Sequence, residues 1–116
     1  MAMNGNPGEV AAARAALAFR RVNELEARLA RIRAGDRAGT ADVVAAIMSL
    51  AEAKVHERAA RRRAVDEHEA AAESHRKAAL LLSQAGHHDR ATDHLVAAQL
   101  DDLAATKVGA DHPEQT

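Results

Sequence analysis

Proline and glycine, the residues that interrupt helices, occur at only a few places in this chain. The two prolines, Pro7 and Pro113, lie close to the ends, and neither proline nor glycine occurs between Gly39 and Gly86. Proline removes a backbone donor and clashes inside a helix, and glycine weakens a helix. This spacing predicts an all-α protein with one unusually long central helix.

The apolar residues are mostly alanine. The chain has 31 Ala among its 116 residues, against ten Leu, eight Val, two Ile, three Met and one Phe. Alanine is the strongest helix former, and the aromatic and β-branched residues that favour strands are scarce. A bulky side chain contributes about 1.5–3 kcal/mol when fully buried, and alanine far less. We therefore expect helices that share a narrow seam, with a thin core that a second chain completes.

A first helix is predicted over about residues 9–34, after a disordered tail of residues 1–8. Asn6 suits the N-cap and Pro7 the first helical position, and Glu9 completes a capping box. Apolar residues then recur in alternating steps of four and three, as in a coiled coil. This stripe consists of Ala11, Ala15, Ala18, Val22, Leu25, Leu29 and Ile32.

A second helix is predicted over residues 41–85. Gly35 suits a left-handed C-cap of the preceding helix, and Thr40 suits the N-cap of this one. The acidic stretch from Asp66 to Glu69 has the pattern of another capping box. The sequence leaves open whether the long helix is continuous or breaks there.

A third helix is predicted over residues 89–108. Gly86 is expected to close the second helix, and Asp89 is the expected N-cap of the third. Gly109 is expected to stop the third helix, so that residues 109–116 form a disordered tail. Residues 9–108 would then form a single helical domain.

The helix lengths and short connections predict a specific architecture. Each outer helix is about half as long as the central one, so each can cover only half of it. Short connections favour antiparallel neighbours. We expect a long central helix with a shorter helix folded back at each end, in coiled-coil-like helical hairpins. Two-helix layers leave apolar surface uncovered, which indicates an oligomer or a bound partner.

The bulky apolar residues give the predicted interaction seams. The first seam uses Val22, Leu25, Leu29 and Ile32, with Val44, Met48 and Val55 opposite. The second uses Leu80, Leu81, Leu95 and Leu103. These stripes serve helix–helix recognition, either within the chain or with another chain.

One segment, residues 72–103, resembles a known repeat family. The stretch LLSQAGHHDRATDHLVAA places Gly86 at a turn and then Ala91, Leu95 and Ala98 at spacings that suit close helix contact. It resembles the turn of a tetratricopeptide repeat, in which small residues let two helices approach and stacked repeats bind peptides. The aromatic and Leu-Gly positions of that family's first helix are missing, and His88 stands where it often has an aromatic residue.

Histidines, with the nearby Asp89 and Asp93, are the candidate metal ligands. His87, His88 and His94 lie around one turn, and imidazole is a common zinc ligand. There is no His-Glu-x-x-His motif and no cysteine, so we expect neither a metal nor another cofactor. His68 and His75 lie one heptad apart on one helix face, and we expect them at the surface without a switching role.

Nothing in the sequence indicates catalysis. The serines lie outside any glycine-rich elbow, and no glycine-rich phosphate loop occurs. We therefore expect that the protein is not an enzyme.

Charge is unevenly distributed along the chain, although the net charge is only −1. Residues 1–39 hold seven Arg against four acidic residues, and residues 86–116 hold two basic against six acidic residues. The run Arg61-Arg62-Arg63 could contact phosphate, but acidic residues flank it and no aromatic residue is present for base stacking. Nucleic acid is therefore not the expected partner.

The sequence favours a non-catalytic protein–protein interaction module, either a homo-oligomeric scaffold or an adaptor. One alternative is a nucleic-acid-associated accessory protein that uses the Arg-rich N-terminal half, and another is a metal-binding helical protein. The first residues do not resemble a secretory signal, and no apolar run is long enough to span a membrane. We expect a cytoplasmic protein.

Overall fold

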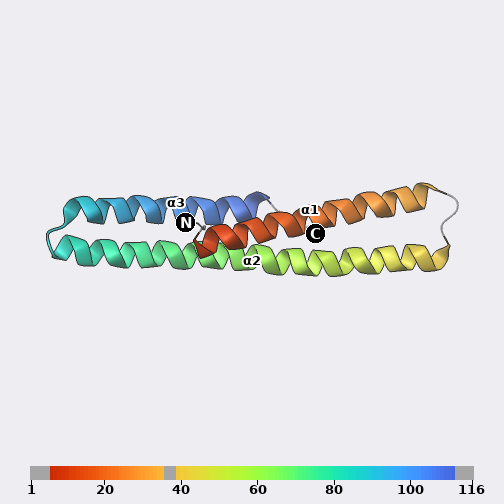
Figure 1. The fold of residues 1–116 in the computed structure, drawn as a ribbon, viewed down its shortest axis with the longest axis horizontal. Coiled ribbons are helices and arrows are strands. Elements are labelled where there is room, and N and C mark those ends of the chain that lie inside the picture. The colour runs from red at the N-terminus through yellow and green to blue at the C-terminus, as the bar shows by residue number, and fades with distance from the viewer. Residues whose placement is uncertain (1–5, 36–38, 112–116) are drawn as a thin grey trace, which may run out of the picture.

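The computed structural model describes residues 6–35 and 39–111, and these form three α-helices (Figure 1). The helices are α1, Pro7–Ala34; α2, Thr40–Gln84; and α3, His88–Asp111. The described residues contain no strand, which confirms the all-α prediction. α2 runs through Asp66 and Glu69 without a break, so the central helix is continuous.

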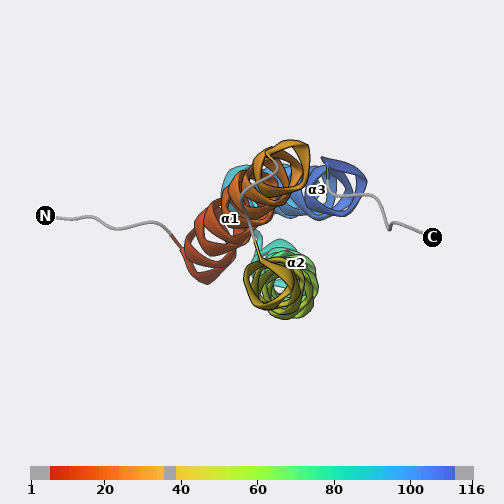
Figure 2. The same cartoon turned by 90° about the vertical axis from the view of Figure 1, so that its right-hand side faces the viewer.

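α2 forms the long axis of the molecule. Its 45 residues span about 68 Å at about 1.5 Å per residue, close to the longest dimension of the molecule, which is 71 Å. α1 packs along the N-terminal half of α2, and α3 packs along its C-terminal half (Figure 1). Both lie on the same side of α2, so its other side carries no helix of the described chain (Figure 2).

The start of α1 follows the predicted capping pattern. The side chain of Asn6 accepts a hydrogen bond from the Glu9 backbone N–H at 2.8 Å, and the Glu9 carboxylate accepts one from the Asn6 N–H at 3.3 Å. Pro7 occupies the first turn, where its missing N–H costs nothing. The capping box is therefore confirmed, although α1 begins at Pro7 rather than near residue 9.

The two ends flanking the first connection differ from the prediction. Gly35 adopts an extended conformation, with φ −90° and ψ 138°, rather than the left-handed one. The N-cap of α2 is Gly39, and Thr40 is the first helical residue without capping through its side chain. Both shifts fall at helix ends, where sequence signals locate a boundary only to within a residue or two.

The turn between α2 and α3 is a glycine-dependent helix stop. Gly86 has φ +85°, which only glycine adopts readily. The N–H of His87 donates to the Leu82 carbonyl at 2.8 Å, and the N–H of Gly86 donates to the Ser83 carbonyl at 3.0 Å. These two bonds define a Schellman motif, which satisfies the last carbonyls of α2 and reverses the chain.

α3 is longer than predicted at both ends. It begins at His88, so Asp89 lies in its first turn rather than at the cap. It continues through Gly109 to Asp111, because one exposed glycine weakens a helix without ending it. Pro7, Gly8 and residues 109–111, which were predicted to belong to the terminal tails, are therefore helical. Residues 1–5 and 112–116 lie outside the described part of the chain.

The buried core is composed mainly of alanine. Among the described residues, nine alanines are buried, together with only three bulky apolar residues, Val22, Leu25 and Leu29. Twelve large apolar residues are exposed, and Glu57, His68 and Asp101 are buried. In most proteins the bulky apolar residues are buried and the charged residues are exposed. Here the outer faces carry most of the bulky apolar side chains, and three polar side chains are buried.

Candidate functional site

The α1–α2 seam carries the bulky part of the core. Val22 and Leu25 of α1 cluster with Ala53 and Leu50 of α2. Leu29, one turn further along, is also buried, and Ile32 is half-buried near the end of the helix. The predicted stripe of α1 therefore lies against α2.

The residues of α2 that face this stripe are not the predicted ones. Met48 and Val55 are 66% and 57% exposed, and Val44 is exposed as well. The positions turned toward α1 are instead Val43, Ala46, Leu50, Ala53 and Glu57. Met48 lies two residues from Ala46 and from Leu50, and two residues turn a helix by about 200°. The predicted set therefore occupies the side of α2 that faces away from α1.

The α2–α3 seam is formed by small side chains. Its buried alanines are Ala72, Ala79, Ala91, Ala98 and Ala105. The four leucines predicted for this seam, Leu80, Leu81, Leu95 and Leu103, are exposed instead. Alanine lets two helix backbones approach closely, and this leaves the longer neighbouring side chains no space between the helices. A role for these leucines in contact with another chain stays a prediction.

A buried polar pair crosses the alanine seam. His68 of α2 is 4% exposed and Asp101 of α3 is 7% exposed. The Nδ1 atom of His68 lies 2.8 Å from Oδ1 of Asp101. A polar group this deeply buried destabilises the fold unless it has a hydrogen-bond partner, so each residue requires the other. The pair therefore favours one register between α2 and α3.

Two further histidines extend this pair into a polar cluster of His68, His75, His94 and Asp101. Nε2 of His75 lies 3.9 Å from Oδ2 of Asp101. Nδ1 of His75 lies 2.9 Å from Nδ1 of His94, and the ring centroids are 5.1 Å apart. A hydrogen bond between two imidazole nitrogens needs one nitrogen with a proton and one without. The two rings must therefore hold complementary protonation states at these atoms.

The N-terminus of α1 closes over this cluster. A Cβ atom added to Gly8 would lie 2.6 Å from Nδ1 of the His68 ring, which is closer than real atoms approach. Nearby, Ala11 and Ala15 pack with Ala64, and Val108 of α3 packs against that group. All three helices therefore meet around the middle of α2.

Only part of this polar cluster was predictable from the sequence. The heptad spacing of His68 and His75 gave their shared face, but the expectation that they lie at the surface is wrong for His68. Asp101 was not singled out, because an aspartate on a helix is usually solvent-exposed. Its spacing from Ala98 and Ala105, three and four residues away, was the available signal.

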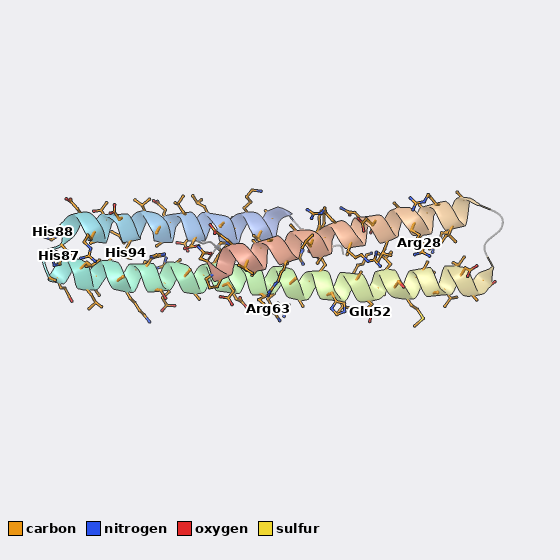
Figure 3. All side chains as sticks on the ribbon, in the orientation of Figure 1. Arg28, Glu52, Arg63, His87, His88 and His94 are labelled. Atoms are coloured by element: carbon orange, nitrogen blue, oxygen red, sulfur yellow. The ribbon has the colours of Figure 1, made fainter. Side chains whose placement is uncertain are left out.

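The candidate metal ligands do not converge. His87 and His88 are exposed at the turn, whereas His94 points into the seam toward His75 (Figure 3). Within residues 6–35 and 39–111, no group of three or more His, Asp or Glu side chains has the arrangement of a metal site.

The arginine run divides between two environments. Arg61 lies 3.9 Å from the Glu57 carboxylate, and both side chains are largely buried beside the α1–α2 seam. Arg62 and Arg63 are exposed. The run therefore does not present three adjacent cations to one surface.

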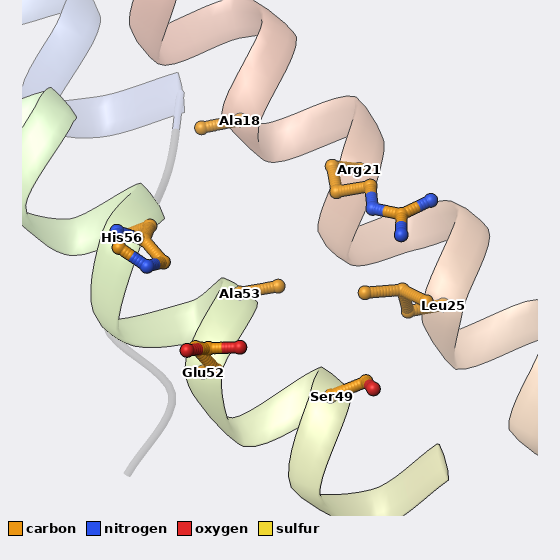
Figure 4. A pocket seen from close by; sticks show the side chains of 7 residues that line it. All are labelled: Ala18, Arg21, Leu25, Ser49, Glu52, Ala53 and His56. Carbon is orange, nitrogen blue, oxygen red and sulfur yellow. The ribbon is translucent and has the colours of Figure 1, made fainter. Parts of the chain in front are cut away.

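The hollows along the hairpins are open grooves. One of about 220 Å³ lies between α1 and α2 and is lined by Ala18, Arg21, Leu25, Ser49, Glu52, Ala53 and His56 (Figure 4). Another of about 360 Å³ follows the α2–α3 seam beside Leu80, His88 and Leu95. Two packed helices enclose little volume, so neither groove surrounds a small molecule as an active site does.

The most extensive candidate surface is the side of α2 turned away from α1 and α3, which we call the outer face of α2. Arg63 marks this side in Figure 3, and Glu52 lies at its edge, next to the α1–α2 groove. Its residues are all exposed: Val44, Met48, Glu52, Val55, Ala59, Arg62, Arg63, Asp66, Ala70, Glu73, Lys77, Leu80 and Leu81. The face has apolar side chains at both ends and charged ones in the middle.

Comparisons of the chain with protein families, with curated proteins and with solved structures found no match. None of the three described helices contains an apolar stretch long enough to cross a membrane.

Proposed function

We propose that this protein is a non-catalytic helical interaction module that assembles with a second copy of itself as a homo-oligomeric scaffold. The observation that carries the proposal is the inverted core. Alanine fills the seams, while Met48, Leu80, Leu81, Leu100 and Leu103 are each at least 60% exposed. Exposed bulky residues in rows are typical of surfaces that another chain covers.

The energetics of the single chain support the same proposal. Three buried bulky side chains contribute about 1.5–3 kcal/mol each. Ordering the backbone costs about 1–2 kcal/mol per residue, and small chains offset this only with a substantial core or with oligomerisation. Burial of the exposed leucines and valines by a second copy would supply the missing apolar contacts.

The shape of the chain also favours an interaction role over catalysis. Catalytic groups act in concave sites that exclude water. The described residues form only two-helix layers with open grooves, and the polar cluster lies inside a seam lined by alanine. These features position helix faces for contact with another helix.

Light scattering on a gel-filtration column tests the proposal directly. We expect a mass of twice the 12.3 kDa of the chain, or a higher multiple, at micromolar concentration and neutral pH. The apparent mass should fall on dilution, because association depends on concentration. A mass of one chain at all concentrations would contradict the proposal.

A second candidate function has one specific observation in its favour. Arg14, Arg21 and Arg28 are spaced one heptad apart and are all exposed, so they form a basic row on one flank of α1. Such a row could contact a nucleic-acid backbone in an accessory role. Filter binding with duplex and single-stranded probes at low salt tests this, and the absence of any retention would eliminate it.

A further inference from the structure

The outer face of α2 has a symmetric residue pattern. Four pairs of exposed residues at equal distances before and after the midpoint between Ala64 and Val65 have matching or complementary character, whereas Val55 lies opposite Ser74 and Leu80 opposite Ser49. Arg63 and Asp66 form the innermost pair. The pairs further out are Ala59 with Ala70, Glu52 with Lys77, and Met48 with Leu81. All eight side chains are exposed; Lys77 lies 3.7 Å from Glu73 on the same helix, and Glu52 borders the α1–α2 groove.

This symmetry matters because it matches a particular way of pairing two identical helices. In an antiparallel pair related by a two-fold axis, a residue before the axis in one copy faces the equivalent position after the axis in the other. The charged positions then meet opposite charges, the alanines meet alanines, and Met48 meets Leu81. An isologous contact must be self-complementary in this way.

We infer that two copies of this chain pair antiparallel through the outer face of α2, around a two-fold axis at the midpoint between Ala64 and Val65. This inference rests on the proposed self-assembly and adds its surface, orientation and register. Two small residues, Ala59 and Ala70, let the helices approach on either side of the axis. The apolar ends, which include Val44 and Leu80, cover each other.

The charges decide the orientation. Arg62 and Arg63 precede the midpoint, and Asp66, Glu69 and Glu73 follow it. A parallel, in-register pair would place arginine against arginine and acid against acid, which is destabilising. The antiparallel pair places the arginines of each copy against the acidic residues of the other.

The outer side of α3 is the competing surface. Val96, Leu100 and Leu103 form an exposed row there, opposite the seam with α2. This row is short and ends at Lys107, whereas the outer face of α2 extends from Val44 to Leu81, about 55 Å at about 1.5 Å per residue. Length and charge pattern therefore favour the outer face of α2 as the dimer interface. Pairing through α3 is an alternative outcome of the cross-linking experiment.

Charge reversal tests the register. Arg63→Glu and Asp66→Arg each place like charges across the axis, so each variant alone should dimerise about tenfold more weakly or worse. A mixture of the two variants should recover one-to-one dimers, because each copy then faces an opposite charge. Mixing leaves contacts within each chain unchanged, so recovery reports only on contact between chains. Native mass spectrometry distinguishes the mixed dimer from both homodimers.

Arg21→Glu and Glu24→Arg provide the matched control. This pair has the same three-residue spacing and opposite charges, but it lies on exposed α1 positions. Its mixture should show no preference for mixed dimers. A wild-type dimer whose strength is unaffected by the changes at Arg63 and Asp66 would overturn the inference and leave the proposed function standing. A monomeric wild-type protein would overturn both.

Cysteine cross-linking distinguishes the two surfaces, since the chain has no native cysteine. A mixture of Met48→Cys and Leu81→Cys chains should cross-link between copies with a short bismaleimide. Leu100→Cys alone should not cross-link to itself. Efficient cross-linking at Leu100, without linkage between positions 48 and 81, would assign the dimer to α3 and overturn the inference.

Discussion

The two hairpins of this protein share α2 but pack by different means. Between α1 and α2, the bulky side chains Val22, Leu25 and Leu29 are buried. Between α2 and α3, none of the bulky apolar side chains that the structure describes is buried, and alanines surround the pair His68 and Asp101. The first hairpin gains stability mainly from apolar area, whereas the second relies on close backbone approach and on the polar cluster of His68, His75, His94 and Asp101.

This difference predicts different sensitivities in the two hairpins. A seam of bulky residues is damaged when apolar volume is lost or charge is introduced. A seam of alanines has little volume to lose and is damaged when volume is added. The predictions below test this contrast by thermal or denaturant unfolding at one fixed protein concentration, because dimers unfold in a concentration-dependent way.

The largest effect is expected for Leu29→Asp in the first hairpin. Leu29 is 7% exposed, so the substitution buries an unpaired carboxylate in place of an apolar side chain. The expected loss is about 4 kcal/mol or more of unfolding free energy. The control is Leu17→Asp, on the outside of the same helix at 58% exposure, which should change stability far less. Equal effects at the two positions would mean that the first seam is misassigned.

Ala98→Leu should destabilise the second hairpin by about 1–3 kcal/mol. Ala98 is buried where α3 meets α2, and a leucine there would force the two helices apart. The matched control is Ala13→Leu, at an exposed position of α1, where helix propensity changes little. If Ala98→Leu stabilised the protein, the α2–α3 seam would contain unfilled volume around Ala98, which contradicts close alanine packing.

Asp101→Ala should destabilise the protein by about 1–2 kcal/mol more than Asp102→Ala. Both changes gain the same helix propensity, but only Asp101 accepts a hydrogen bond from buried His68. Asp102 is half-exposed and pairs with Arg76 at the surface. Urea unfolding of the two variants side by side provides the measurement. Identical midpoints would mean that the buried pair contributes nothing to stability.

The helices themselves were predictable from local chemistry. Asn6, Pro7 and Glu9 specify the start of α1 because capping involves residues only three positions apart. The stripe through Val22, Leu25 and Leu29 was predictable for a similar reason. In the C-terminal half of α1, all the bulky apolar residues, Val22, Leu25, Leu29 and Ile32, lie on one face, so the periodicity there has one solution.

The inward face of α2 could not be predicted in the same way. Val43 and Val44 are adjacent, as are Ile47 and Met48, so apolar residues occur on both sides of the helix. Which side turns inward depends on the register of α1, which is a tertiary property. The assumption that bulky residues lie inside led to the prediction that Met48 and Val55 face α1. In the structure, Leu50 and Ala53 pack against α1 instead.

Prediction of the polar cluster would require even more tertiary information. Asp101 and His68 are 33 residues apart and meet only once the Gly86 turn sets the alignment of α3 along α2. Gly8 approaches the same histidine from a third helix, with no local signal beyond its lack of a side chain. Contacts of this kind follow from the assembled register and cannot be read from a heptad pattern.

The smallest effects are expected at the exposed ion pairs, of which each hairpin offers one between its helices. Lys54 and Glu26 link α2 to α1 at 3.7 Å, and Arg76 and Asp102 link α2 to α3 at 3.0 Å. Double-mutant cycles with alanine should give coupling energies below about 1 kcal/mol for both, because water and salt screen exposed charges. The Arg76–Asp102 coupling should be the larger, since that pair also forms a hydrogen bond. If neither pair couples measurably, the hairpins differ only in their buried seams. A strong coupling at Arg76–Asp102 would mean that surface charge helps to hold the hairpin with the smaller apolar core.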